Sequence, residues 1–204
     1  MAFTTRTFAL SATAGALAVL LAACGGAAAD TTPQGGSSSA TAQGVASAGS
    51  AADISFAQLM IPHHQQAVEM ADMALEQAST PEVRELAVQI KAAQDPEIQM
   101  MSDWLESWGA PMKMDGDHDS HDMGGMTMSG MMTDEEMQAL AAASGADFDQ
   151  MWLQMMIAHH EGAVSMADEV LVASDNPAVI ALADDVIAGQ AAEIDTMKQL
   201  LLSD

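Results

Sequence analysis

The residues best suited to chemistry in this chain are two pairs of adjacent histidines set among methionines. His63 and His64 form the first pair, and His159 and His160 form the second pair 96 residues further on. Imidazole nitrogens bind copper, zinc, iron and nickel, and a thioether sulfur selects Cu(I) most strongly among the common biological metals. The two pairs therefore indicate a metal site, and copper is the first metal to consider.

The histidines belong to an internal repeat. The segment 60–72 returns as 156–168, and residues 53–105 share 22 identities in 53 positions with residues 149–201. A repeat of this length is a unit of architecture and not a coincidence. Each copy is therefore expected to place its histidine pair on an equivalent element.

Both copies have the pattern of two helices joined by a short turn. In the first copy, apolar residues recur every three or four positions over residues 56–74 and again over 83–108, and the second copy repeats this pattern. A cap residue followed by a proline, Pro81 or Pro177, marks the start of the second helix of each copy. Short connections make antiparallel neighbours, so the sequence predicts an all-α four-helix bundle built from two helical hairpins.

The pattern divides the chain into five parts. They are a signal peptide at residues 1–23, a flexible tether at 24–52, a first hairpin at 53–108, a methionine- and histidine-rich loop with a short helix at 109–146, and a second hairpin at 147–204. The short helix is predicted from the capping-box signature that begins at Thr133.

The helical stripes carry polar residues at positions that should face the bundle axis. These residues are His63, Gln94, Glu97, His159, Gln190 and Glu193. A buried polar group without a partner costs on the order of 1–3 kcal/mol, so six of them at equivalent places imply a shared polar layer. This layer is either a hydrogen-bonded cluster or a metal site. Pro62 and Pro96 lie beside it inside predicted helices and favour a kink in the first copy alone.

The spacing around the histidines suits a metal. Met60 lies three residues before His63 and four before His64, so the three side chains can lie on neighbouring parts of one helix face. The expected bundle ligands come from both copies and from the facing helices: Met60, His63, His64, Met70, Glu97, Met101, Met156, His159, His160, Met166, Glu193 and Met197. The alternative is that the methionines fill the core and the histidines are satisfied polar groups.

A second group of candidate ligands lies between the two copies. It consists of Met112, Met114, His118, His121, Met123, Met126, Met128, Met131 and Met132. Glycine and serine separate these residues, so they cannot form a packed helix face, and packing does not explain exposed methionines. The group predicts a weaker, exchangeable collector of soft metal, with oxidant scavenging or tolerated low complexity as alternatives.

The N-terminal end predicts export and a lipid anchor. An apolar stretch over residues 8–21 leads into Leu-Ala-Ala-Cys-Gly, which resembles a bacterial lipobox that would place a lipid on Cys24. The lipid would hold the chain at the outer face of the cell membrane. An ordinary cleaved signal with an incidental cysteine is the alternative. Cys24 is the only cysteine, so no internal disulfide can form.

The charge of the chain limits its partners. The formal net charge is −24, with 29 acidic residues against 5 basic ones, and removal of the signal takes away one of the basic residues, Arg6. Phosphate contacts need lysine and arginine, so no nucleic-acid partner is expected. Long-range attraction favours cations, although acidity also keeps an exported protein soluble.

The second copy resembles the signature of a bacterial family. Residues 155–167 read Met-Met-Ile-Ala-His-His-Glu-Gly-Ala-Val-Ser-Met-Ala, and residues 190–197 read Gln-Ala-Ala-Glu-Ile-Asp-Thr-Met. Both are similar to the domain-of-unknown-function-305 family. The first copy departs from the family pattern at Leu59 and at Gln66, where glycine is usual and a longer side chain would narrow the approach to His63. The resemblance implies a ferritin-like four-helix bundle, and members of the CopM type are exported copper-binding proteins.

Together these features predict an exported protein that holds copper, as Cu(I), for resistance, buffering or hand-over to a copper-handling partner protein. The chain is not expected to be an enzyme. A ferritin-like di-metal oxidase would need Glu-x-x-His motifs, and methionine or isoleucine stands three residues before each paired histidine. A metal-free envelope interaction module, in which the polar layer only fixes packing, is the other alternative.

Overall fold

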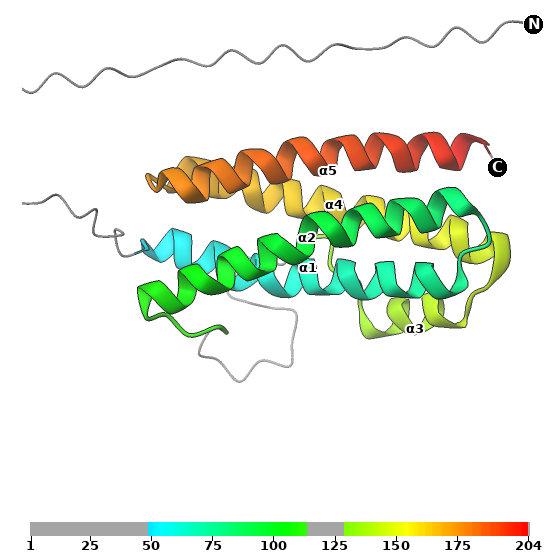
Figure 1. The fold of residues 1–204 in the computed structure, drawn as a ribbon, viewed down its shortest axis with the longest axis horizontal. Coiled ribbons are helices and arrows are strands. Elements are labelled where there is room, and N and C mark those ends of the chain that lie inside the picture. The colour runs from blue at the N-terminus through cyan, green and yellow to red at the C-terminus, as the bar shows by residue number, and fades with distance from the viewer. Residues whose placement is uncertain (1–48, 114–128, 204) are drawn as a thin grey trace, which may run out of the picture. The chain divides into compact units, whose positions relative to one another are not determined.

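The computed structural model describes residues 49–113 and 129–203, which all belong to one unit of the chain, Ala42–Asp204. The helices are α1 (Ala51–Gln77), α2 (Pro81–Trp108), α3 (Asp134–Ala142), α4 (Gly145–Ala173) and α5 (Pro177–Ser203) (Figure 1). The described residues contain no strand, so the predicted all-α class is confirmed. The predicted signal peptide and most of the tether lie outside the described residues, as do Cys24, Met114, His118, His121, Met123, Met126 and Met128.

The helices begin and end where local sequence signals place them. Ser50 and Asp53 form a capping box at the start of α1, with backbone-to-side-chain distances of 3.1 and 2.8 Å. Thr133 and Glu136 form the predicted capping box at the start of α3. Gly109 ends α2 at a φ of 66°, a left-handed conformation that glycine adopts without a Cβ clash.

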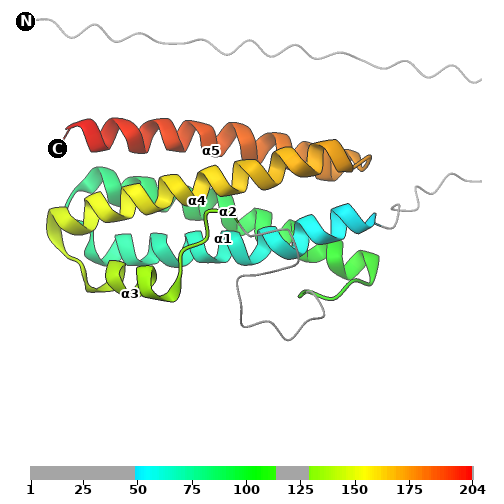
Figure 2. The same ribbon diagram turned by 180° about the vertical axis from the view of Figure 1, so that it is seen from behind.

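The four long helices form two hairpins that pack through one seam. α1 lies along α2, α4 lies along α5, and α1 and α4 make the main contact between the hairpins. α2 and α5 touch only slightly. Figures 1 and 2 show this arrangement from opposite sides, with α3 as a short helix outside the four.

Two buried aspartates tie each hairpin to the turn of the other. Asp149, near the start of α4, accepts hydrogen bonds from the Ser79 and Thr80 amides, both at 2.9 Å, and from the Ser79 hydroxyl at 2.7 Å. Burial acts to raise the pKa of Asp149, but these hydrogen bonds outweigh it and lower the pKa. Asp53, at the equivalent place in α1, accepts a hydrogen bond from the Ser174 hydroxyl in the turn between α4 and α5. The start of each of these helices therefore meets the other hairpin's turn, so α1 and α4 run antiparallel.

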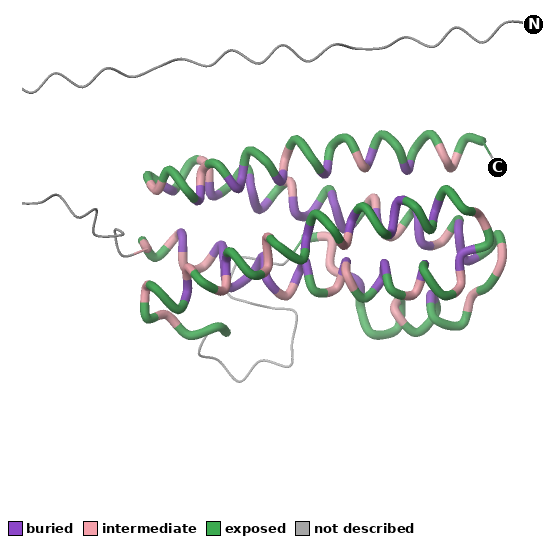
Figure 3. The backbone as a smooth tube through the Cα atoms, in the orientation of Figure 1, coloured by how far each residue is buried: buried purple, intermediate pink, exposed green. Residues whose placement is uncertain are grey.

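The apolar core divides into two clusters along the length of the helices. One cluster contains the second half of α1 and the first half of α4, and includes Ile90 and Trp152. The other contains the first half of α1 and the second half of α4, and includes Phe56 and Leu105. Every long helix passes from one cluster to the other at the predicted polar positions, which are His63, Gln94, Glu97, His159, Gln190 and Glu193. His64 and His160, which the sequence places one step around the helix, are buried with them. Figure 3 shows the buried positions that line the inner faces of the helices.

The helices that carry the polar layer are long and continuous. α1 continues through Pro62 and α2 continues through Pro96. A proline-induced kink in the first copy stays a prediction. Within the described ranges, no helix combines the length and the apolar character needed to cross a membrane.

Candidate metal centre

The four paired histidines lie in the middle of the unit, and each is fully buried. His63 from α1 and His159 from α4 meet across the seam, with ring centroids 3.8 Å apart and ring planes at 39°. The His160 ring centroid lies 6.4 Å from that of His159. The fold therefore brings the two copies of the histidine pair together between the two apolar clusters.

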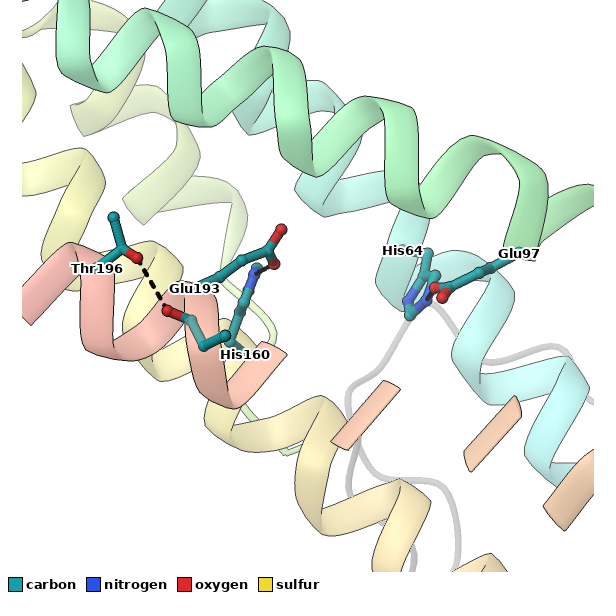
Figure 4. A network of polar contacts seen from close by, with 6 residues as sticks. His64, Glu97, His160, Glu193 and Thr196 are labelled. Carbon is teal, nitrogen blue, oxygen red and sulfur yellow. Dashed lines mark hydrogen bonds and ion pairs between the residues drawn. The ribbon is translucent and has the colours of Figure 1, made fainter. Parts of the chain in front are cut away.

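The outer histidine of each pair binds a glutamate of its own hairpin. His64 Nε2 lies 2.7 Å from Glu97 Oε2, and His160 Nε2 lies 2.7 Å from Glu193 Oε2. The two carboxylates are partly exposed, at 20% and 18% of their side-chain surface, and so reach from solvent to the buried rings. Figure 4 shows both pairs, with Thr196 on α5 one turn beyond Glu193.

The inner histidines are held in the neutral form. Burial, followed by the nearby charge of His64, lowers the pKa of His63 from 6.5 to about 3. Burial and the neighbouring His63 lower the pKa of His159 well below its ordinary value. A neutral imidazole carries a free lone pair, which is the form that binds a metal.

Much of the polar layer lacks a hydrogen-bond partner within the described residues. The unpartnered buried atoms are Nδ1 of His63, His64 and His160, both ring nitrogens of His159, both amide atoms of Gln94, and Oε1 of Gln190. Buried polar atoms are normally paired, and each exception needs an explanation. Imidazole nitrogens that bind a metal would lack a hydrogen-bond partner in this way.

The methionines predicted as bundle ligands are all buried. Met60, Met70, Met101, Met156 and Met197 are fully buried, and Met166 is 8% exposed. They also belong to the two apolar clusters, so they fill the core as well as offering thioether sulfurs. In the described part of the chain, no three His, Cys, Asp or Glu side chains come close enough to hold a metal. A metal site here would therefore need thioether sulfurs beside the imidazoles, since the histidines and carboxylates of the described residues do not form one alone.

A short strap, residues 129–132, lies against the layer from outside the long helices. The Ser129 carbonyl lies 3.1 Å from His63 Nε2. Gln66 binds the Met132 backbone twice, through its amide nitrogen at 2.8 Å and its amide oxygen at 2.7 Å. A Cβ at Gly162 would lie 1.8 Å from the Ser129 carbonyl oxygen, so glycine there lets the strap approach α4. Sequence reasoning missed the strap, although Gln66 and Gly162 occupy the same position of the two copies.

Both ends of the methionine- and histidine-rich loop are tied to α1. Gln58 donates a hydrogen bond to the Pro111 carbonyl at 2.7 Å, and the strap is held by His63 and Gln66. Three of the predicted loop methionines are described: Met112 is 48% exposed, Met131 is partly buried, and Met132 is 7% exposed. The loop therefore begins and ends beside the helix that carries His63 and His64.

A family profile described as a domain of unknown function (DUF305) matches residues 53–201. The chain belongs to this family. The match covers both hairpins, the strap and every described polar-layer residue. No curated protein matches the chain.

Solved DUF305 structures share the fold. The Cu(II)-bound form of CopM is 38% identical, with 74% of this chain and 96% of that chain covered and a TM-score of 0.63. A DUF305 fragment from Deinococcus radiodurans is 32% identical, with 76% and 99% covered and a TM-score of 0.67. A putative secreted DUF305 protein from Streptomyces coelicolor is 36% identical, with 74% and 93% covered and a TM-score of 0.66. CopM also matches in its Cu(I)-bound and Ag-bound forms.

Proposed function

We propose that this chain is an exported copper-binding protein that holds Cu(I) in the buried histidine layer. The observation that carries the proposal is the contact between His63 and His159, whose rings are neutral, fully buried and 3.8 Å apart. The likeness to CopM, solved with copper and with silver, supports the same class of metal. The role that follows is copper resistance, buffering or transfer outside the cytoplasm.

The residues divide this work between two places. In the layer, His63 and His159 would supply imidazole nitrogens, and Met60 and Met156, three residues before them, would supply thioether sulfurs. The loop between the hairpins would act as the weaker, exchangeable collector. The two hairpins would form a ferritin-like four-helix bundle in which α2 and α5 are the loosely packed pair.

Lipidation of Cys24 would anchor the protein at the outer face of the cell membrane and leave residues 25–52 as the tether. This follows from the lipobox-like sequence. The intact mass of the membrane-fraction protein tests it. A lipid-modified chain that starts at Cys24 is expected, whereas a soluble product unaffected by Cys24→Ser would contradict anchoring.

Two other functions receive less support. A metal-free interaction module would need a self-satisfied polar layer, and eight buried polar atoms of this layer have no partner within the described residues. A ferritin-like oxidase would use glutamates as metal ligands, and Glu97 and Glu193 are engaged by histidines. We therefore propose a binding protein and not an enzyme.

Competition titration with Cu(I) and with Zn(II) tests the metal site. The protein is the untagged mature chain with residues 114–128 replaced by a Gly/Ser linker, here called the loop-replaced chain, which keeps the strap. We expect it to bind Cu(I) more tightly than Zn(II), because thioethers contribute little to zinc sites. The double variant His63→Ala/His159→Ala should lose this binding, while Met100→Ala on the exposed face of α2 should keep it. Absence of Cu(I) binding, or tighter zinc binding, would reject the proposal.

A further inference from the structure

The same histidine–glutamate contact occurs in both copies of the repeat. In each, Nε2 of the outer histidine lies 2.7 Å from Oε2 of a glutamate on the partner helix of its hairpin. The two copies differ at most of their aligned positions, yet this contact has the same atoms and the same length in both. Both histidines are fully buried, and both glutamates keep about a fifth of their surface in solvent. The contact is therefore a built feature of the layer.

The partner of each Nε2 fixes where the ring proton lies. An ionised carboxylate and a backbone carbonyl can only accept hydrogen bonds. Nε2 of His64 and His160 faces a carboxylate, and Nε2 of His63 faces the Ser129 carbonyl, so Nε2 carries the proton in all three. In the neutral form of each ring the lone pair then lies on Nδ1, which is buried and unpartnered within the described residues in all three rings.

We infer that the layer binds metal through Nδ1, and that Glu97 and Glu193 are positioning residues that hold the opposite side of the His64 and His160 rings. This rests on the proposed function and adds His64 and His160 to its donors. Because no three His, Cys, Asp or Glu side chains of the described residues lie close enough to hold one metal, the four rings do not share a single ion. Metal-binding histidines commonly donate their other N–H to a carboxylate or a carbonyl, which fixes the tautomer and raises the basicity of the binding nitrogen. The glutamates, expected from the sequence to be ligands, act here through the rings.

This arrangement also narrows the class of ion. With both carboxylates engaged, the donors left for a metal are imidazole nitrogens and thioether sulfurs. Such a set adds no negative charge and suits a soft monovalent cation, Cu(I) or Ag(I), better than a hard divalent one. The preference of the site for a monovalent ion would then depend on Glu97 and Glu193 staying bound to Nε2 of His64 and His160.

The first test measures the tautomer without any metal. Nitrogen-15 NMR of the histidine rings in the full mature chain distinguishes a protonated Nε2 from a protonated Nδ1, residue by residue. We expect protonated Nε2 in His63, His64 and His160. Protonated Nδ1 in His64 and His160 would overturn the inference, whatever the protein binds.

The second test adds Cu(I) to the same sample and compares variants. Nδ1 signals of the layer should move on binding, and Glu97→Leu and Glu193→Leu should each weaken Cu(I) binding by about 10–100-fold. Glu97→Gln and Glu193→Gln keep an accepting oxygen and should lose much less. Glu161→Gln, which removes the carboxylate of an exposed pair with Lys198, is the control and should change nothing.

The outcomes separate the two proposals. If Cu(I) moves Nε2 signals, or if the glutamine variants lose as much affinity as the leucine variants, the glutamates are ligands and the inference fails while the proposed function stands. If the wild-type layer shows no response to Cu(I), the proposed function fails and the metal-binding part of the inference fails with it. Circular dichroism of each variant establishes that lost affinity does not reflect lost folding.

Discussion

The two copies of the repeat share their outer histidine contacts and differ around their inner histidines. His64 and His160 each bind a glutamate at 2.7 Å. His63, in contrast, has the strap carbonyl at Nε2, whereas both nitrogens of His159 lack a partner within the described residues. Identical sequence motifs have therefore acquired different surroundings.

The strap meets both copies at the same position of the repeat. The first copy has Gln66, which binds the strap backbone, and the second has Gly162, which gives the strap room beside α4. The single strap passes between α1 and α4. It therefore needs a side chain that binds it on one helix and a small residue that leaves space for it on the other. The comparison shows that the two copies share the histidine–glutamate contacts, whereas, within the described residues, the strap forms a hydrogen-bond contact with His63 and none with His159.

The largest expected effect concerns the inner pair and pH. Because burial lowers the pKa of His63 from 6.5 to about 3, only the unfolded state takes up this proton between those values. Above pH 6.5 this histidine therefore leaves the free energy of unfolding unchanged. As the pH falls from 6.5 towards 3, the free energy of unfolding decreases by up to about 1.4 kcal/mol per pH unit for each such histidine. His159, whose pKa is also lowered, should add to this loss.

Urea unfolding at pH 7, 6 and 5 measures this loss in the metal-free chain. The double variant His63→Leu/His159→Leu should show a clearly shallower dependence, because it lacks both groups while keeping the same aspartates and glutamates. Equal slopes in wild type and variant would show that the inner histidines are not held neutral.

The next largest effect compares the two aspartates that join the hairpins. Asp149→Asn removes a charge that accepts three hydrogen bonds, and it should cost about 3 kcal/mol of unfolding free energy. Asp53→Asn replaces a carboxylate that accepts two such bonds and should cost less. Urea unfolding of both variants checks the order, and a larger loss for Asp53→Asn would contradict it.

Two helical glycines, one against the strap and one with open space around it, offer a matched pair of substitutions. Gly162→Ala forces a methyl group against the Ser129 carbonyl, and it should lower the free energy of unfolding by about 1–3 kcal/mol. Gly189→Ala lies in the interior of α5 with nothing within 4 Å of its Cβ, so it should raise stability by about 0.5–1 kcal/mol. Melting temperatures that change in the same direction for both variants would argue against close contact between the strap and Gly162.

The smallest effect follows from removing the Gln66 side chain, which holds the strap to the first copy. Gln66→Ala removes two hydrogen bonds to Met132, each with a net worth of about 0.5–1.5 kcal/mol, and frees the strap locally. Amide hydrogen exchange at Met132 should become faster, while exchange at Leu105 in the distant cluster should not change. Unchanged protection at Met132 would mean that other contacts hold the strap.

Much of this architecture follows from the sequence. The helical stripes, Pro81, Pro177 and the Thr133 capping box predict the helices because each is a local signal. The polar positions on the stripes likewise predict a buried layer, since helix periodicity places them on the same inward face as the apolar residues.

The remaining features depend on contacts between distant parts of the chain. The Asp149 bonds to Ser79 and Thr80, and the strap contact at His63, join residues about seventy positions apart that no periodicity relates. The assignment of Glu97 to His64 Nε2 needs a rotamer and a distance, which spacing alone does not supply. The departure of Gln66 from the repeat was the one local sign of the strap.

The most direct test of the copper-binding layer is the melting temperature of the loop-replaced chain with and without Cu(I). A ligand that binds only the folded state stabilises it by about 2.7 kcal/mol at one hundred times its dissociation constant, so the midpoint should rise clearly. The midpoint of His63→Ala/His159→Ala should not rise, while that of Met100→Ala should rise as in the wild type. Equal midpoints for the wild-type loop-replaced chain with and without Cu(I) would contradict a metal site in the buried layer.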